Sequence, residues 1–271
     1  MNIPFLKMHG AGNDFVVVDR RNATPIDAAT ATKLADRRFG VGCDQVVVLE
    51  PSSKADVFMR LFNHDGSEIG ACGNASRCIG QLLMDETGKA KASIETLAGV
   101  LEATRADTGI TVDMGEPKWE WRDIPLAESR NTLHLGLQEG MLMDPVSINI
   151  GNPHMIFFVR DIDMVDLAKS GPKLEHDALF PQRVNVSVVK VLSEDHFVMK
   201  TWERGAGLTL ACGSAACATV VAAVRREIGV RKATVDVPGG RLFIEWNAGE
   251  GNGKVLMTGP AAKVFEGSIE L

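Results

Sequence analysis

The 271-residue chain contains no tyrosine, which removes phenols from the acid–base groups that it could use. It has no basic run longer than a pair such as Arg225-Arg226, and its net charge is −6, so we expect no nucleic-acid partner. Its most apolar stretch, residues 215–224, is far too short to cross a bilayer. The first residues also lack the charged and then apolar layout of a signal peptide. The sequence therefore predicts no association with a membrane.

Cysteine is sparse: the chain has five cysteines, so they cannot all be paired with one another. Without an export signal, this usage predicts reduced thiols and a cytoplasmic location. The Cys-x-x-Cys pair of a thioredoxin-type redox site is absent. The glycine-rich residues 9–13 are too short to match a P-loop or a dinucleotide-binding motif. We therefore expect neither a thioredoxin-type redox pair nor a bound nucleotide.

The chain does contain a long internal repeat, because residues 71–75 read ACGNA and residues 211–215 read ACGSA. Asn63 stands nine residues before the first of these cysteines, and Glu203 stands nine before the second. The match extends to further segments, pairing residues 91–95 with 232–236, 99–101 with 240–242, and 12–13 with 151–152. A single long repeat indicates two copies of one domain. Each copy then brings one thiol to what we expect to be a shared site.

Hydrophobic periodicity predicts strands and two central helices. The first of these helices ends near Gly88 and the second at Gly229. The second is apolar nearly all round and should be buried, and a surface helix is expected over residues 27–39, capped by Gly40. The expected strands, rich in Val, Ile and Phe, are 15–18, 45–49, 57–62, 93–96, 100–104, 110–114, 155–159, 184–191, 196–201, 234–237, 242–246 and 254–258.

These elements predict an α+β fold of two pseudo-symmetric domains. Each domain is expected to be a curved, mostly antiparallel sheet wrapped around a central helix. The boundaries are placed at residues 1–117 and 118–261, with residues 262–271 crossing back to the first domain.

Cys72 and Cys212 each stand immediately before a central helix. The helices begin with a small residue and then a capping side chain, Gly73 and Asn74 in one copy and Gly213 and Ser214 in the other. A helix N-terminus offers unpaired N–H groups and a positive dipole end, so it can lower the pKa of a thiol and hold a carboxylate. Two such ends facing one carboxylate would be suited to moving a proton across a carbon centre.

Other reactive side chains have simpler explanations. Cys78 and Cys217 lie mid-helix on apolar stripes, so core packing is favoured over reactivity or zinc binding, and Cys43 has no supporting context. His154 is singled out because it lies in the repeated block that also supplies Asn13. Glu203 and Arg204 lie between a strand and a glycine-rich turn. They could bind a ligand, or they could simply form an ion pair on the surface.

Several longer motifs together resemble a known family. They are residues 7–15 (KMHGAGNDF), 63–68 (NHDGSE), 71–74 (ACGN), 151–154 (GNPH) and 203–214 (ERGAGLTLACGS). With them, the chain closely resembles the diaminopimelate epimerase family over essentially its whole length. Ala75 departs from that family, which more often has glycine after Cys-Gly-Asn.

The resemblance implies a cofactor-independent epimerase, without pyridoxal phosphate or metal, that interconverts LL- and meso-diaminopimelate in lysine and peptidoglycan-precursor biosynthesis. It also implies a cytoplasmic homodimer, with the strand around residues 262–265 as a contact. Of the catalytic pair Cys72 and Cys212, one acts as a thiolate that removes the α-proton, and the other as a thiol that delivers a proton to the opposite face.

The resemblance also implies a role for each remaining site residue. The reacting carboxylate would be bound by N–H groups of Gly73, Asn74, Gly213 and Ser214. The distal carboxylate would be bound by Asn63, Asn152, Asn185 and Arg204, with Glu203 on the distal ammonium and Asn13 and Gln45 completing the pocket. His154 and Glu203 would keep one cysteine charged and the other neutral.

Two alternatives stay open. The first is another two-cysteine isomerase of this fold, such as a proline racemase-like enzyme, which needs no distal grip. The pair Glu203-Arg204 and its asparagines argue for a substrate with a second amino-acid head. The second is a non-catalytic thiol sensor or metal binder, which metal titration and thiol counting would reveal.

Overall fold

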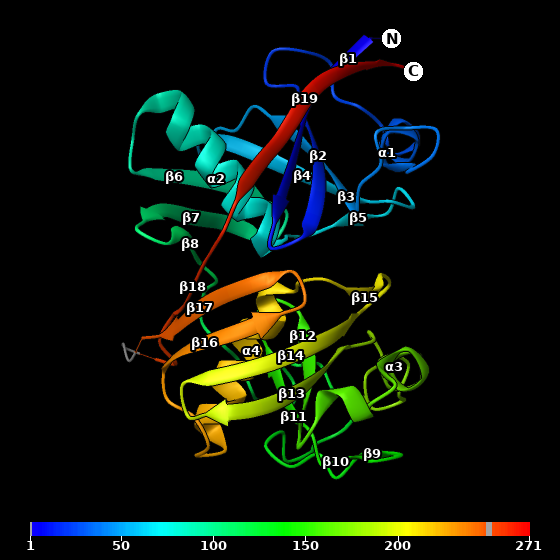
Figure 1. Cartoon of the computed structure of the whole chain (residues 1–271), viewed down its shortest axis with the longest axis vertical. Helices are drawn as coiled ribbons and strands as arrows, with labels where there is room; N and C mark the ends of the chain where they lie inside the picture. Colours follow the sequence, from blue (N-terminus) through cyan, green and yellow to red (C-terminus); the bar gives the residue numbers. More distant parts are fainter. Residues whose placement is uncertain (1, 248–250) are drawn as a thin grey trace. The chain divides into compact units, whose positions relative to one another are not determined.

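The computed structural model describes residues 2–247 and 251–271, which form two compact units (Figure 1). Unit 1 comprises Met1–Val112 and Thr258–Leu271, and unit 2 comprises Asp113–Met257. The boundaries expected from the sequence, 1–117 and 118–261 with the tail returning, lie a few residues from these divisions. That each unit is a separate domain stays a prediction.

Unit 1 is built mainly from strands. Its elements are β1 (Asn2–Gly10), β2 (Asn13–Asp19), α1 (Ala28–Ala35), β3 (Gln45–Glu50), β4 (Val57–Asn63), β5 (Glu68–Ile69), α2 (Gly73–Thr87), β6 (Lys91–Thr96), β7 (Gly99–Ala106), β8 (Gly109–Asp113) and β19 (Ala262–Glu270). Strand β1 lies antiparallel between β2 and β19, β2 is parallel to β3, and β3 is antiparallel to β4. Strand β4 is antiparallel to β5 and parallel to β6, and β6 is antiparallel to β7.

Unit 2 repeats this order. Its elements are β9 (Gln138–Glu139), β10 (Leu142–Met143), β11 (Val146–Asn149), β12 (Pro153–Val159), η1 (Ile162–Met164), α3 (Leu167–Glu175), β13 (Asn185–Ser193), β14 (His196–Glu203), β15 (Gly207–Thr209), α4 (Gly213–Arg225), β16 (Lys232–Val237), β17 (Gly240–Trp246) and β18 (Val255–Gly259), which ends within unit 1. Strand β12 is antiparallel to β11 and parallel to β13, and β14 is antiparallel to β13 and β15 but parallel to β16. The sequence repeat is therefore also a repeat of strand pairing.

One helix lies at the centre of each unit, as expected. Helix α2 packs on β1, β6 and β7, and α4 packs on β11, β12 and β17 (Figure 1). Helix α4 is buried nearly all round, which confirms the prediction from its apolar sequence. Helix α2 ends at Gly88, in the left-handed conformation with φ 70°, as predicted. The two-part, mostly antiparallel α+β fold expected from the sequence is confirmed.

Two helix ends differ from the prediction. Helix α4 stops at Arg225 rather than at Gly229, because Glu227 takes the left-handed conformation with φ 59° and the N–H of Ile228 bonds back to the carbonyl of Ala223. Helix α1 stops at Ala35, because the backbone of Asp36 is extended. The Asp36 carboxylate then accepts hydrogen bonds from the backbone N–H groups of Arg38 and Phe39.

Several elements have no counterpart in the sequence prediction. They are α3, η1 and strands β1, β5, β9, β10, β11 and β15, and β19 extends well beyond the expected residues 262–265. Helix α3 was missed because Pro172 lies inside it. It nevertheless starts at a regular cap, where the Asp166 carboxylate accepts from the N–H of Lys169.

Candidate active site

In unit 1, Cys72 is the N-cap residue of α2, directly after β5 and its connecting turn. Its extended backbone leads into Gly73, the first helical residue. Asn74 does not act as the expected capping side chain, and its Nδ2 instead donates to Asn13 Oδ1 at 3.2 Å. The Cys72 thiol lies 3.7 Å from the same Asn13 oxygen. Cys72, Asn74 and Asn13 therefore form one cluster.

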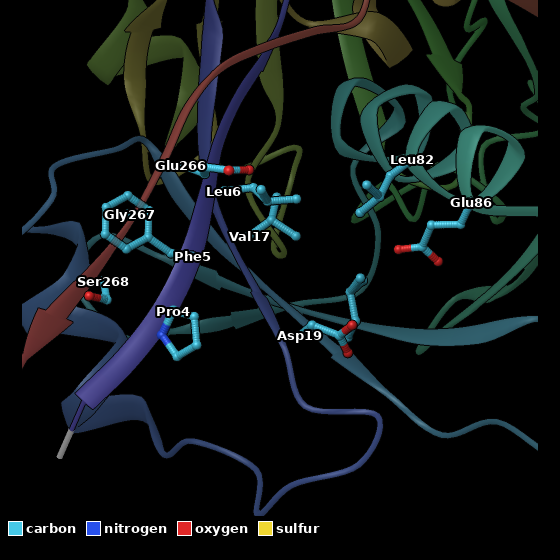
Figure 2. Close-up of a pocket in the computed structure, with 11 residues that line it drawn as sticks. Pro4, Phe5, Leu6, Val17, Asp19, Leu82, Glu86, Glu266, Gly267 and Ser268 are labelled. Carbon is cyan, nitrogen blue, oxygen red and sulfur yellow. The ribbon is translucent and has the colours of Figure 1, made fainter.

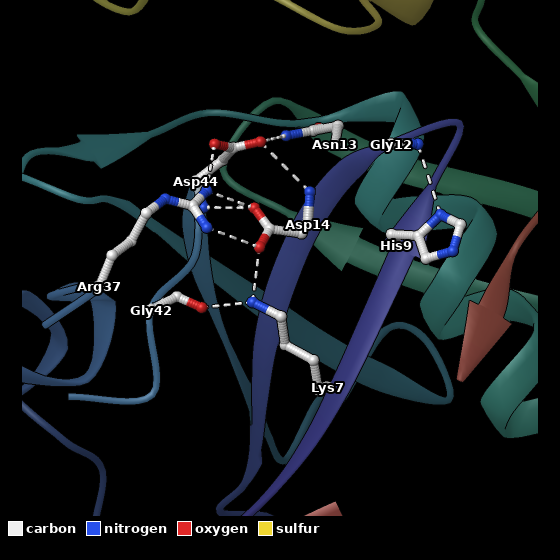
Figure 3. A network of polar contacts seen from close by, with 8 residues as sticks. All are labelled: Lys7, His9, Gly12, Asn13, Asp14, Arg37, Gly42 and Asp44. Atoms are coloured by element: carbon white, nitrogen blue, oxygen red, sulfur yellow. Dashed lines mark hydrogen bonds and ion pairs between the residues drawn. The ribbon is translucent and has the colours of Figure 1, made fainter. Parts of the chain in front are cut away.

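The orientation of the Asn13 amide is set by a charged network at the start of β2 (Figure 3). Asn13 Nδ2 donates to Asp44 Oδ2 at 2.9 Å, so its oxygen points to the thiol side. Arg37 holds both acids, at 2.8 Å from Asp44 and 2.7 Å from Asp14, and the buried Lys7 ammonium lies 2.6 Å from Asp14. Hydrogen bonds from these cations outweigh the effect of burial and lower the pKa of Asp14, so it stays ionised.

Two further site residues of unit 1 face each other across paired strands. Gln45 on β3 is the register partner of Asn63 on β4, and Gln45 Nε2 donates to Asn63 Oδ1 at 3.2 Å. Asn63 Nδ2 donates to Ser67 Oγ at 3.1 Å. Gln45 Oε1 is buried and has no hydrogen-bond partner among the described residues. A buried acceptor of this kind is available to a donor on a ligand.

In unit 2, Cys212 is the N-cap residue of α4 and is 4% exposed. Burial raises the pKa of this thiol well above its usual value, and the charge of Glu203 raises it further. A hydrogen bond with Ser214, 3.6 Å away, lowers the pKa but does not reverse the shift. The expectation of a lowered thiol pKa at the helix start is therefore wrong for Cys212, because loss of hydration and the Glu203 charge outweigh the hydrogen bonds from Ser214 and from the backbone at Ala215.

The other site residues of unit 2 are joined by short contacts. His154 on β12 is the register partner of Asn185 on β13, and its Nε2 lies 2.8 Å from Asn152 Oδ1. Asn185 Oδ1 accepts from the Arg204 backbone N–H at 2.8 Å. His154 is fully buried, and loss of hydration, aided by the Arg204 charge, lowers its pKa to about 3, so it is neutral.

Two polar groups of this cluster lack protein partners in the described part of the chain. Asn185 Nδ2 is a buried donor and His154 Nδ1 is a buried ring nitrogen, neither with a hydrogen-bond partner there. The exposed Arg204 side chain donates from Nη1 to the Gln182 carbonyl at 2.9 Å, and no carboxylate in residues 2–247 and 251–271 forms an ion pair with it. Neutral His154 faces the Asn152 oxygen with Nε2, so its Nδ1 is an acceptor, and Asn185 Nδ2 is the one donor of the two. An unpaired buried donor beside an arginine suits an anionic ligand.

Sequence reasoning missed two residues that support these clusters. Asp44 orients Asn13, and Glu175, at the end of α3, accepts from the N–H of Gly205 at 3.0 Å, next to Arg204. No local pattern marks either residue, because each acts on a segment distant in sequence. Asp14, which belongs to the same charged network as Asp44, lies within the family motif of residues 7–15 and could have been found from it. Asp44 and Glu175 lie outside the motifs.

The remaining cysteines are packing residues. Cys43, Cys78 and Cys217 are buried, and burial raises the pKa of Cys43 and Cys78 to about 12. Across the described residues, no three His, Cys, Asp or Glu side chains are grouped so as to hold a metal ion. No helix in the same residues is long and apolar enough to cross a membrane.

A separate cavity of about 480 Å³ lies in unit 1 (Figure 2). Two of its three acids, Asp19 and Glu86, are paired with Arg21, at 2.6 and 2.9 Å, and the third, Glu266, is paired with Lys263. Its lining residues are Pro4, Phe5, Leu6, Val17, Asp19, Leu49, Leu82, Glu86, Glu266, Gly267 and Ser268. None of the candidate site residues lines this cavity, so it is distinct from the cluster of Cys72, Asn74 and Asn13.

Comparison with known proteins supports one family. The family model for diaminopimelate epimerase matches residues 5–120 and 146–264. A protein named diaminopimelate epimerase from Rhodospirillum centenum is 53% identical over 269 residues, covering 98% of this chain and 91% of that protein.

Solved structures show the same fold at low identity. A PhzF-family phenazine biosynthesis protein from Bacillus anthracis superposes with a TM-score of 0.71 at 18% identity, covering 100% of both chains. A hydroxyproline epimerase from Agrobacterium vitis superposes with a TM-score of 0.71 at 15% identity, covering 99% of this chain and 91% of the other. The family match over most of the chain and the 53% identical relative together place this chain in the diaminopimelate epimerase family.

Proposed function

We propose that this protein interconverts LL- and meso-diaminopimelate without a cofactor, in lysine and peptidoglycan-precursor biosynthesis. The name of its 53% identical relative supports the substrate. The two cysteines support the chemistry, because each is the N-cap residue of a central helix in a repeated arrangement of strands. In this proposal Cys72 and Cys212 act on opposite faces of one α-carbon.

The protonation states support a starting arrangement. The raised pKa of Cys212 makes it the thiol, so in one direction Cys72, as thiolate, removes the α-proton. Cys212 then gives its proton to the opposite face and becomes the thiolate. The reverse direction runs the same steps backwards, with Cys212 as the base. Glu203 disfavours the Cys212 thiolate and so favours return of the proton.

The chief barrier is the low acidity of a proton next to a carboxylate. Backbone N–H groups at Gly73-Asn74 and Gly213-Ser214 are proposed to bind that carboxylate and stabilise the charge that develops on it. The helix dipoles are fixed before the reaction, so this stabilisation costs no reorganisation. Asn13 is held by Asp44 beside the Cys72 thiol and is proposed to border the reacting carbon.

The single observation that carries the choice of substrate is Arg204. It is an exposed cation whose backbone N–H bonds to Asn185, the residue that carries the buried, unpartnered Nδ2, and the structure describes no carboxylate paired with the Arg204 side chain. We propose that Arg204 binds the distal carboxylate, with Asn63, Asn152 and Asn185 as further donors. The Glu203 carboxylate and the Gln45 oxygen would accept from the distal ammonium. A simple amino acid such as proline has no group for these residues.

The test is direct. The protein is incubated with LL-diaminopimelate, without added cofactor, and the meso isomer is measured by chiral chromatography, with proline and 4-hydroxyproline as parallel substrates. We expect meso product only from diaminopimelate, and a loss of about 2–5 kcal/mol in transition-state stabilisation for Arg204→Met, because a charged partner is removed. Comparable turnover of proline, or near-normal activity of Arg204→Met, would contradict the proposal.

A further inference from the structure

Glu175 is a buried carboxylate that the proposed chemistry does not use. It is the last residue of α3 and is 4% exposed. Its Oε2 accepts from Trp202 Nε1 at 2.7 Å, and its Oε1 accepts from the Gly205 N–H at 3.0 Å. Arg183, at 3.4 Å, is its ion-pair partner, and that arginine is half exposed. All three neighbours are donors, so the position needs a group that only accepts.

The contact to Gly205 holds the turn between β14 and β15, which carries Glu203 and Arg204. Two successive backbone N–H groups of this turn end on side chains from other elements. Arg204 N–H bonds to Asn185 on β13, and Gly205 N–H bonds to Glu175 on α3. The turn is therefore fixed at two adjacent points and cannot rotate without breaking a partly buried hydrogen bond.

Packing joins the same helix to the strand before the turn. A Cβ at Gly171 on α3 would lie 2.5 Å from the Trp202 ring, so the indole rests directly on the helix backbone. A Cβ at Gly207, after the turn, would lie 3.5 Å from the other end of the same indole. Helix α3, Trp202 and the turn therefore form one packed unit, and Glu175 is its polar link.

We propose that Glu175 is a positioning residue that sets where Glu203 and Arg204 meet the distal head of the substrate. This inference rests on the proposed function, because it assigns those two residues to the distal head. Both oxygens of Glu175 are already bonded to protein donors, so it acts through the turn rather than on the substrate. Its loss should weaken recognition of the second amino-acid head and leave the reacting end intact.

The main test compares Glu175→Gln with the wild type. The glutamine amide would present N–H groups to a donor, either Trp202 or Gly205, so the turn must shift. We expect the KM for diaminopimelate to rise about tenfold to a hundredfold, as a displacement on the order of 1 Å can cause, while kcat changes much less. Glu175→Asp keeps an acceptor-only group, so its KM should lie between those of the wild type and Glu175→Gln. If Glu175→Gln does not fold, the KM of Glu175→Asp is compared with that of the wild type instead.

Ser187→Ala is the matched control. Ser187 Oγ lies 3.0 Å from Thr201 Oγ1, a buried contact across the same β13–β14 pair but away from the turn. Its thermal stability should fall while its KM stays within about twofold, because KM does not depend on the amount of folded enzyme. Amide exchange should increase over residues 203–207 in Glu175→Gln and not in Ser187→Ala.

An unchanged KM for Glu175→Gln, with lowered stability alone, would overturn the inference and leave Glu175 a structural residue. Unchanged exchange over residues 203–207 would overturn it as well. Failure of the proposed function is distinguishable, because the wild type would then not epimerise diaminopimelate. The exchange experiment would still report whether Glu175 holds the turn.

Discussion

At Cys212, burial and a neighbouring carboxylate act in the same direction on one thiol. Both raise its pKa, and the hydrogen bond from Ser214 acts against them. Two side chains therefore tune the same group with opposite sign. In the proposed reaction this makes Cys212 the proton donor of the resting enzyme, and the carboxylate of Glu203 maintains that state.

Substitution of these two neighbours should move the pKa of Cys212 in opposite directions. Glu203→Gln removes a negative charge and should lower the pKa, so alkylation by iodoacetamide at a fixed pH should become faster. Ser214→Ala removes a hydrogen bond that favours the thiolate and should raise the pKa, so alkylation should become slower. The rates are measured against pH in the Cys72→Ala background, so that only one candidate thiol is followed. Shifts of the same sign in both variants would contradict this assignment.

The candidate residues came mostly from motifs, and the structure adds what motifs do not contain. Cys72 and Asn13 are far apart in sequence, but the repeat and the family pattern name both, and they are in contact. Glu175 and Asp44 carry no such mark, because their roles depend on contacts with segments that only the fold brings near. The direction of the Cys212 pKa shift could not be predicted from the sequence either, because burial of its sulfur depends on how the chain packs.

At the level of elements, the prediction succeeded where hydrophobic periodicity is strong and the element is long. The two central helices and most long strands of both units follow such patterns. Short strands such as β5 and β15 carry too few residues for a period, and β19 is largely exposed, so alternation does not mark it. Helix α4 was misjudged at its end, since a glycine was expected where Glu227 takes the left-handed conformation.

The ends of the two central helices offer a matched test of stability. Glu227→Gly should raise the free energy of unfolding by about 0.5–1 kcal/mol, because glycine adopts a positive φ without the strain that a side chain adds there. Gly88→Ala should lower it by about 1 kcal/mol for the same reason, since a Cβ at Gly88 contacts nothing within 4 Å and only its φ of 70° is strained. Both are measured by urea denaturation. A loss in the first variant would mean that the Glu227 side chain contributes more than its backbone strain costs.

At the level of the whole molecule, one arrangement of strands is used twice. In each copy a strand pair, β2 and β3 or β12 and β13, carries polar residues of the candidate site, and the central helix begins at a cysteine. A duplicated unit supplies two similar thiols, and reaction on two faces of a carbon requires two proton carriers. The second copy differs by the charged pair Glu203-Arg204, which gives the proposed site a distinct distal end.

The central claim is that two cysteines serve opposite faces of one carbon, and the most direct test is the fate of the α-proton in deuterated water. With LL-diaminopimelate as substrate, the thiol that protonates the product face carries solvent deuterium before the substrate binds. The proton removed from the substrate stays on the other thiol and is returned to the same face if the step reverses. Early in the reaction the meso product should therefore carry solvent deuterium, while the recovered LL substrate should carry almost none, as measured by mass spectrometry after chiral separation. Substantial early deuterium in the recovered substrate, or near-normal epimerisation by Cys212→Ala, would contradict the two-base account.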